Sequence, residues 1–279
     1  MPGYSTELAA AREFALLGGR IALRHYRKDP QRERKADGTW VTEADWAVEA
    51  QIRLRIARTF PDHNVLGEEE GLTAAGGGAP RADAPTWIID PIDGTTNYIA
   101  GIPVWATLVG LQVGKRSVVG VCHAPALGET YQAAIGLGAQ CNDEAISVDP
   151  QSRLEEATVI FGAAEAFKDH GLAAFFEDLI RAGGRSRGFG DFWGHMLVAR
   201  GAAHVMVEPR LAVWDVAALE PIVSEAGGKL SRLDGSRWSP NSSCLTTNGA
   251  LHDRVGALAR EANGPASPYG KVTSQPPEG

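Results

Sequence analysis

The sequence predicts a mixed fold in which an α+β half precedes an α/β half. Short apolar or alternating runs between turn residues fill 104–148, which is typical of an antiparallel sheet. Beyond Asp149, strand-like runs alternate with helical ones, and this alternation is typical of α/β layers. We therefore expect two halves, 1–148 and 149–263, in one compact unit, followed by a disordered tail rich in Pro, Gly and Ser at 264–279.

Two helices are expected at the start of the chain. Apolar residues recur at helical spacing over 5–26, and the stripe at 48, 52, 56 and 60 repeats every four residues. Between them, 31–38 is charged and ends in an Asp-Gly turn. The second helix is expected to open near Thr42, because Thr42 and Asp45 have the spacing of a capping box, and Pro61 ends it.

Short strands are then expected on either side of a loop. One strand lies at 65–66 and the other at 87–89, and the tract 74–84, with three consecutive glycines, predicts a mobile surface loop. A proline at 221 is expected to kink the helix 215–226. The remaining expected strands are 104–112, 117–123, 129–134, 144–148, 158–161, 205–207 and 244–247, and the remaining helices are 171–182, 190–201 and 251–262.

Composition narrows the class of protein. The chain has 279 residues, with 34 acidic side chains against 27 Lys and Arg, and this acidic balance argues against a nucleic-acid partner. No segment reaches the roughly 18 apolar residues of a membrane span, and no signal-peptide pattern is found. Three scattered cysteines, Cys122, Cys141 and Cys244, indicate a reducing compartment. We expect a cytoplasmic protein without nucleic-acid or membrane partners.

The most informative segment is 90–97, Asp-Pro-Ile-Asp-Gly-Thr-Thr-Asn. Asp90 ends an apolar strand and Asp93 follows three residues later, so the two carboxylates need a cation between them. Gly94 permits a positive φ, and a helix that begins at Thr95 would offer unpaired amides to an anion. This pattern favours a Mg²⁺ site bridged by a phosphate. The alternative is an Asx turn at a strand end, which explains a single Asp but not the whole string.

Three further carboxylates are individually ambiguous. Glu68 is expected at the end of a strand, as Asp90 is, but three adjacent glutamates at 68–70 are also typical of a solvated charge run. Asp45 is explained by the capping box, and Asp215 could be a helix N-cap. The seven histidines show no metal-ligand spacing, so we interpret them as surface or core residues.

Together these segments closely resemble the inositol monophosphatase family over approximately 5–260. The resemblance rests on Gly67-Glu68-Glu69, the run 87–97, and Trp214-Asp215-Val216-Ala217-Ala218 followed by Glu225-Ala226-Gly227-Gly228. It implies a layered αβαβα sandwich of the inositol monophosphatase and fructose-1,6-bisphosphatase type. It also implies a homodimeric, lithium-sensitive phosphatase of small phosphomonoesters that uses two or three Mg²⁺ ions.

The resemblance also implies roles for individual residues. The metal ligands would be Glu68, Asp90, the carbonyl of Ile92, Asp93 and Asp215, and the catalytic residues would be Asp45, Glu68, Asp90 and Thr95. The phosphate and substrate would contact Asp93, Gly94, Thr95, Thr96 and Asp215. Lys35 would lie near the site. Asp45 and Thr95 would orient the attacking water. The chemistry is coherent, because bound metal ions lower the pKa of water and neutralise phosphoryl oxygens during in-line attack.

The leaving-group side carries a second resemblance. Gly190-Asp191-Phe192-Trp193 looks like the histidinol-phosphatase branch of the family. Carboxylates at Asp191 and Glu208 would attract a cationic leaving group, and Arg187 could pair with a phosphate oxygen or hold Asp191 in place. The alternatives are an N-cap for Asp191 and a surface strand end for Glu208. Trp193 is expected in the core or on a pocket wall.

The leading hypothesis is a Mg²⁺-dependent phosphatase of histidinol phosphate, in histidine biosynthesis. One alternative is an enzyme for inositol monophosphate or a broader set of sugar phosphates. A second alternative, from another class, is a regulatory partner of transcription or RNA machinery. The complete ligand set and the lack of a Lys/Arg cluster with interleaved aromatics disfavour that role.

Overall fold

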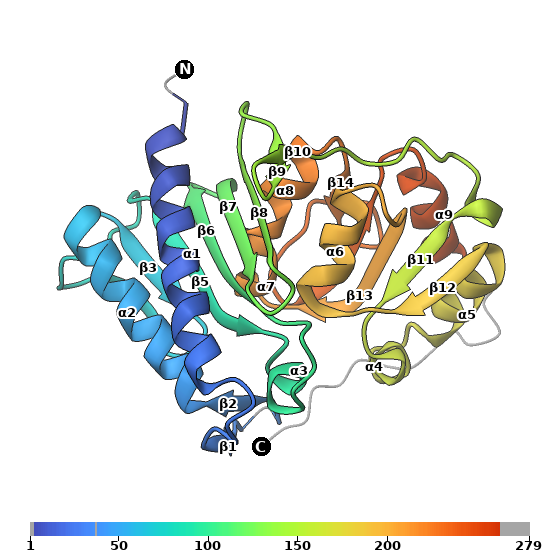
Figure 1. The fold of residues 1–279 in the computed structure, drawn as a ribbon. Helices are drawn as coiled ribbons and strands as arrows, with labels where there is room; N and C mark the ends of the chain where they lie inside the picture. Colours follow the sequence, from blue (N-terminus) through green and yellow to red (C-terminus); the bar gives the residue numbers. More distant parts are fainter. Residues whose placement is uncertain (1–2, 37, 263–279) are drawn as a thin grey trace.

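The computed structural model describes residues 3–36 and 38–262, so the expected tail 264–279 lies outside the described residues. The described chain forms five layers, helix–sheet–helix–sheet–helix, as the family resemblance implies (Figure 1). Helices α1 (Ser5–His25) and α2 (Glu43–Thr59) form the first layer. None of the helices in this part of the chain combines the length and apolarity of a membrane span.

An eight-stranded sheet is the second layer. Its order is β10-β9-β8-β7-β6-β5-β3-β4, and of the pairings described within this sheet only β3–β5 is parallel. The strands are β3 (Asn64–Gly67), β4 (Gly71–Ala74), β5 (Thr86–Asp93), β6 (Ala106–Val113), β7 (Arg116–Ala124), β8 (Glu129–Ala134), β9 (Ala139–Cys141) and β10 (Glu144–Ala145). The expected antiparallel sheet is therefore confirmed, although its last strand is shorter than 144–148.

Both faces of this sheet are buried, which explains its continuous apolar runs. On β6, Val109 packs with the α1 and α2 side, whereas its neighbour Leu108 packs with the central helices, since successive strand residues point to opposite faces. The central layer comprises α6 (Asp191–Ala199), α7 (Val213–Ala217) and α8 (Leu219–Glu225).

A five-stranded sheet and outer helices complete the sandwich. The strand order is β12-β11-β13-β15-β14, with α5 and α9 packed on the face away from α6. The elements are η1 (Leu154–Glu156), β11 (Thr158–Phe161), α4 (Ala164–Asp169), α5 (Ala173–Ala182), β12 (Arg185–Gly188), β13 (Val205–Leu211), β14 (Lys229–Ser231), β15 (Ser242–Thr247) and α9 (His252–Ala262). The alternation expected beyond Asp149 is confirmed, while α4, β12 and β14 were not predicted.

The structure corrects the expected helix 215–226. It is two helices, because α7 ends at Ala217 and α8 begins at Leu219. Pro221 has no N–H to donate to the Ala217 carbonyl, so the first helix cannot continue past this point. Asp215 lies before the break.

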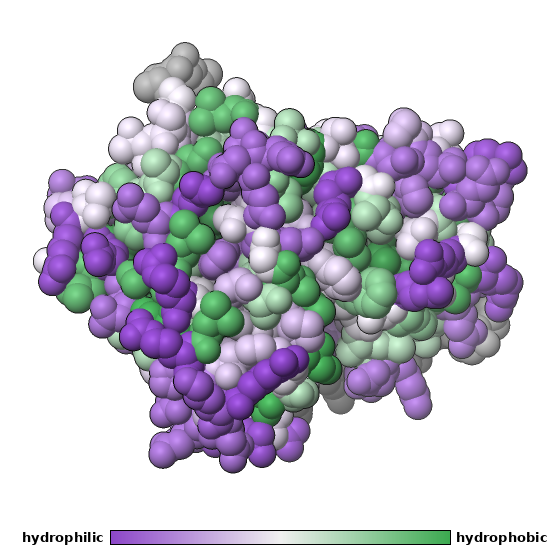
Figure 2. Space-filling model, viewed as in Figure 1, coloured by the Kyte–Doolittle hydropathy of each residue, from purple (hydrophilic) through white to green (hydrophobic). Residues whose placement is uncertain are grey.

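Two loops also take a form that the sequence did not predict. In the charged stretch, Arg32–Arg34 forms strand β1, which pairs with β2 (Trp40–Thr42) as an antiparallel hairpin, and the surface around it is strongly hydrophilic (Figure 2). The loop at 74–84 is tied down at Arg81, whose N–H and carbonyl both bond the Asn64 side chain, at 3.0 and 2.8 Å.

Candidate active site

A cleft of about 940 Å³ opens where the two halves of the chain meet. The carboxyl ends of β5 and β13 reach it, as do the first residues of α3 (Thr95–Ile99), α6 and α7. Ten of the expected site residues line it together, namely Glu68, Asp90, Ile92, Asp93, Gly94, Thr95, Thr96, Asp191, Glu208 and Asp215.

A β-bulge in β5 brings Asp90 and Asp93 to the same cleft. Residues three apart on a regular strand point to opposite faces. Here Asp90 pairs with Leu108 and Asp93 with Ala106, so three residue steps on β5 oppose two on β6. The irregularity turns Asp93 toward Asp90.

Asp90, Asp93 and Asp215 form a carboxylate cluster. Each offers one oxygen, and these oxygens all lie within 4.8 Å of one another. Burial raises the pKa of Asp90 and of Asp93 well above the ordinary range, and the neighbouring carboxylates raise both further. Oδ1 of Asp90 is buried without a hydrogen-bond partner. Such oxygens fit a hard divalent cation, which would both pair the orphan oxygen and relieve the repulsion.

Asp45 and Asp215 are held in the same way at two helix starts. The predicted capping box at Thr42 is confirmed, since Asp45 Oδ2 accepts from the Thr42 amide at 2.8 Å and its hydroxyl at 2.6 Å. Asp45 Oδ1 is buried with no partner. Asp215 Oδ2 likewise accepts from the Ala212 amide at 2.7 Å. Burial raises the pKa of each Asp to about 7. Each cap therefore uses one carboxylate oxygen. Asp215 lines the cleft, whereas the buried Asp45 is not among the residues that line it.

Glu68 is not part of a solvated charge run. The β1–β2 hairpin delivers Lys35, whose Nζ donates to Glu68 at 2.8 Å and to Glu69 at 2.7 Å. Burial by itself would lower the pKa of Lys35, but these two carboxylates outweigh it and raise the pKa above its usual value. Lys35 thus stays charged beside the carboxylate cluster.

The turn after Asp93 has the predicted form. Gly94 has a φ of 81°, and a Cβ there would lie 2.9 Å from the Val104 carbonyl. Helix α3 begins at Thr95, so amides of its first turn are not used within the helix. Thr95 Oγ1 donates to the Ile92 carbonyl at 2.9 Å. The exposed Thr96 lines the same cleft.

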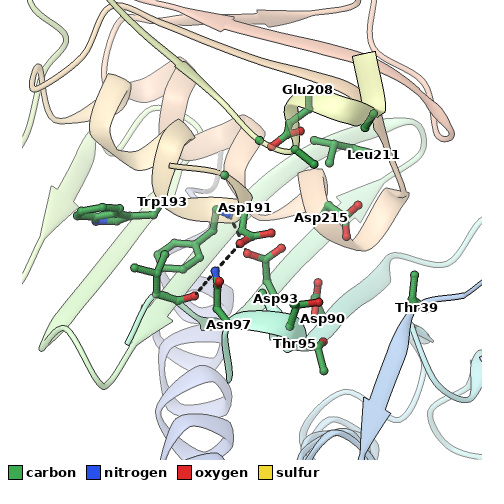
Figure 3. Close-up of a pocket in the computed structure, with 18 of the residues that line it drawn as sticks. Thr39, Asp90, Asp93, Thr95, Asn97, Asp191, Trp193, Glu208, Leu211 and Asp215 are labelled. Atoms are coloured by element: carbon green, nitrogen blue, oxygen red, sulfur yellow. Dashed lines mark hydrogen bonds between the residues drawn. The ribbon is translucent and has the colours of Figure 1, made fainter. Parts of the chain in front are cut away.

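Asp191 and Asn97 line the cleft together on the side where the leaving group is expected. Asn97 Nδ2 donates to Asp191 Oδ2 at 2.8 Å and to the Val104 carbonyl at 3.0 Å (Figure 3). Asp191 has a φ of 56°, a strained conformation that Asp tolerates better than most residues. Its carboxylate makes no capping bond in α6, so the N-cap alternative is wrong. Burial raises its pKa to about 6.

Glu208 faces the same side and is buried, which rules out a surface strand end. Burial, and secondarily the charges of Asp191 and Asp215, raise its pKa to about 8. A side chain at Gly162 would overlap its carboxylate. Trp193 packs on Phe189 with ring centroids 5.0 Å apart and lies on the far side of Asp191 from Asp90 (Figure 3). It is the pocket-wall residue that was expected.

Arg187 does not hold Asp191. Its Nη1 donates to the Ser186 carbonyl at 2.7 Å from the exposed strand β12, and Asn97 occupies the expected place beside Asp191. Asn97 was missed although it ends the string 90–97, because its partner is 94 residues away. His195, a buried cleft residue, was interpreted only as core or surface; burial lowers its pKa to about 3.

Comparison with known proteins gives consistent results. The model of the inositol monophosphatase family matches residues 4–263. A histidinol-phosphatase of Streptomyces coelicolor is 38% identical, covering 91% of this chain and 97% of that protein, and one of Mycobacterium tuberculosis is 41% identical, covering 79% and 85%. A fructose-1,6-bisphosphatase/inositol-1-monophosphatase of Aquifex aeolicus is 34% identical, covering 94% and 98%. The solved inositol monophosphatase from Anabaena superposes with a TM-score of 0.80 at 30% identity, covering 92% and 96%.

Proposed function

Because the chain belongs to the inositol monophosphatase family, we propose that it is a Mg²⁺-dependent phosphatase that hydrolyses L-histidinol phosphate to L-histidinol and phosphate, in histidine biosynthesis. One observation carries the choice of substrate. A buried carboxylate pair, Asp191 and Glu208, faces the cleft beside the carboxylate cluster of Asp90, Asp93 and Asp215. The names of the relatives from Streptomyces coelicolor and Mycobacterium tuberculosis support this choice.

The proposed metal site would hold two or three Mg²⁺ ions. The ligands would be Glu68, Asp90, the Ile92 carbonyl, Asp93 and Asp215. The cluster within 4.8 Å and the orphan Asp90 oxygen support this assignment. Bound Mg²⁺ would supply an acidified water and charge neutralisation of the phosphoryl oxygens.

The remaining catalytic work falls to side chains and amides of the protein. Asp45 Oδ1 has no other partner, so it can accept a proton from the attacking water. Thr95 Oγ1 gives its hydrogen to Ile92, which leaves its lone pairs to orient the same water. The amides of Gly94 and Thr95 would hold phosphate oxygens. Water attacks phosphorus directly, and no covalent enzyme intermediate is required.

The leaving group would be recognised by charge. L-Histidinol carries an ammonium group, and its alkoxide departs toward the side lined by Asp191. The ammonium would pair with Asp191 and Glu208, whose burial makes such pairing stronger than in water. Trp193 and Phe189 would flank the imidazole. A neutral polyol gains only hydrogen bonds from the same carboxylates.

The test is a comparison of kcat/KM for L-histidinol phosphate and inositol 1-phosphate in excess Mg²⁺. We expect a clear preference for histidinol phosphate. A preference for inositol phosphate would instead assign the chain to the inositol or sugar-phosphate alternative. Absence of phosphate release from every small phosphomonoester would favour the regulatory alternative.

A homodimer and a cytoplasmic location complete the proposal. Light scattering of the purified protein would test the first, and fractionation of cells the second. A monomer that retains full activity would remove the dimer from the proposal.

A further inference from the structure

Helix α2 carries a second buried carboxylate one turn after Asp45. Glu49 has no exposed surface, yet it makes no direct contribution to the cleft lining. Its Oε2 accepts from the Glu69 amide and its Oε1 from the Glu70 amide, both at 2.9 Å. Two successive amides that share one carboxylate form an anion-binding nest. Here the anion is supplied by the protein itself.

Arg53 lies one helical turn after Glu49 on α2, and it binds the far end of the segment 68–70. It donates to the Gly71 carbonyl at 2.5 Å and to Thr73 Oγ1 at 2.8 Å. Its Nε also donates to Glu49 Oε1 at 2.8 Å. The glycine at 67 is required by this arrangement, because a Cβ there would overlap the Glu49 carboxylate. We call the pair Glu49 and Arg53 the α2 clamp.

The turn that the α2 clamp holds consists of three consecutive glutamates. Glu68, Glu69 and Glu70 connect β3 to β4 and would repel one another. Lys35 pairs with the first two, and Arg53 lies 3.5 Å from the third. The Glu68 amide donates to the Ile89 carbonyl of β5, so the backbone amides of all three glutamates are hydrogen-bonded and the backbone position of Glu68 is fixed. From this backbone position the Glu68 side chain lines the cleft, and its Oε1 accepts from Lys35 Nζ at 2.8 Å.

We propose that Glu49, supported by Arg53, is a positioning residue that holds Glu68 in place as a metal ligand. This inference rests on the proposed function, in which Glu68 binds Mg²⁺. Partners that orient metal ligands typically change metal affinity by about 10–100-fold when they are removed. Glu49 therefore acts on metal affinity although it does not touch the metal.

The variant Glu49→Gln tests this inference. It keeps the shape of the side chain, but its NH₂ group would face one backbone N–H, which then lacks an acceptor. We expect Mg²⁺ affinity, measured by calorimetry on the full chain, to fall about 10–100-fold. The apparent activation constant for Mg²⁺ should rise in parallel, while kcat at saturating Mg²⁺ changes less than threefold.

Glu225→Gln is the matched control. Glu225 also accepts from a loop amide, that of Gly138 at 2.9 Å, but that loop carries no expected ligand. It should lower the thermal midpoint without changing Mg²⁺ affinity. If Glu49→Gln does not fold, Arg53→Lys replaces it, since it keeps the charge beside Glu49 but loses the fork that reaches both Gly71 and Thr73. A fall of severalfold in Mg²⁺ affinity is then expected.

The outcomes separate this inference from the proposed function. If the wild-type chain binds no Mg²⁺, the proposed metal site fails. If the wild-type chain binds Mg²⁺ and the folded clamp variant binds it equally well, the α2 clamp inference fails alone. Equal losses in Glu49→Gln and Glu225→Gln would also overturn it, because both would then act through stability.

Discussion

The two sides of the cleft are built in different ways. On the side of the proposed metal site, Asp90, Asp93 and Thr95 come from one short segment, and a bulge and a helix start orient them. On the leaving-group side, Asn97 and Asp191 meet across 94 residues of chain. The proposed metal site thus depends largely on residues that are close in the sequence, whereas the proposed recognition of the leaving group depends on how the halves of the chain meet. The two sides can therefore be altered independently, except where one residue serves both.

Asp93 is such a residue, and its replacement should have the largest effect. It belongs to the carboxylate cluster, and its Oδ2 also accepts from the Phe192 amide of α6 at 2.8 Å. We expect Asp93→Asn to lower kcat/KM on the order of 10³-fold for every phosphomonoester, since charge stabilisation is lost in the transition state. Steady-state kinetics would check this, with Asp178→Asn, which lies outside the cleft lining, as control. A loss confined to one substrate would contradict it.

Asp191→Asn should affect only the leaving-group side. Asn tolerates the left-handed backbone at this position, so the loop is preserved while the charge is removed. We expect kcat/KM for L-histidinol phosphate to fall about 30-fold, which corresponds to about 2 kcal/mol of lost transition-state binding. This is the lower end of the cost of losing one partner of a charge pair. Inositol 1-phosphate should be hydrolysed as before. Equal losses for the two substrates would mean that Asp191 is structural.

Removal of the metal should lower the stability of the folded protein, and the loss should depend on pH. Burial raises the pKa of Asp45 and Asp215 to about 7 and that of Glu208 to about 8. A carboxyl group whose pKa is raised in the folded protein favours folding while it is protonated. Its contribution to the free energy of unfolding is complete below the pKa of the unfolded chain, about 4, and is lost as the pH rises through the pKa of the folded protein. The metal-free protein should therefore lose stability between about pH 4 and pH 8.

Added Mg²⁺ should reverse this loss, because it favours the ionised carboxylates. At a free concentration ten times its Kd, it should raise the free energy of unfolding by about 1.4 kcal/mol. Thermal melts at pH 5 and pH 8, each with and without Mg²⁺, would measure the effect. The rise in Tm should be larger at pH 8, and no rise at either pH would argue against the metal site.

Local patterns in the sequence predicted the backbone features around the proposed metal site, whereas the full ligand set was implied by the family resemblance. Thr42 and Asp45 predict a capping box from their spacing alone, and Gly94 predicts a positive φ. These features depend on backbone rules that act within a few residues. The same rules predicted most helices and strands, because both sheets bury apolar runs.

The features that were missed depend on contacts between distant residues. Lys35 was expected near the site, but the β1–β2 hairpin that brings it to Glu68 was not predicted, because the charged residues of β1 do not resemble a strand. Asn97 replaces Arg187 beside Asp191, because the guanidinium lies on an exposed strand instead. Glu49 was not singled out, since a buried Glu among the apolar positions of α2 cannot be told from a surface Glu without its partners.

Asp215 is the proposed metal ligand that lies far in the sequence from Asp90 and Asp93, so its position depends on tertiary packing. The smallest of the predicted effects tests this dependence. The α7–α8 corner packs on strand β7, where a Cβ at Gly120 would overlap the Ala218 carbonyl. Overpacking costs about 1–3 kcal/mol, and replacement of Gly gains about 0.4–1 kcal/mol through the unfolded chain. We therefore expect Gly120→Ala to destabilise the protein by about 1 kcal/mol in urea unfolding, against a change within about 0.5 kcal/mol for the exposed Arg116→Ala. Because the corner moves Asp215, Mg²⁺ affinity should fall severalfold as well. Unchanged affinity in a destabilised Gly120→Ala would show that the cap at Ala212 alone positions Asp215, and that the metal side is local after all.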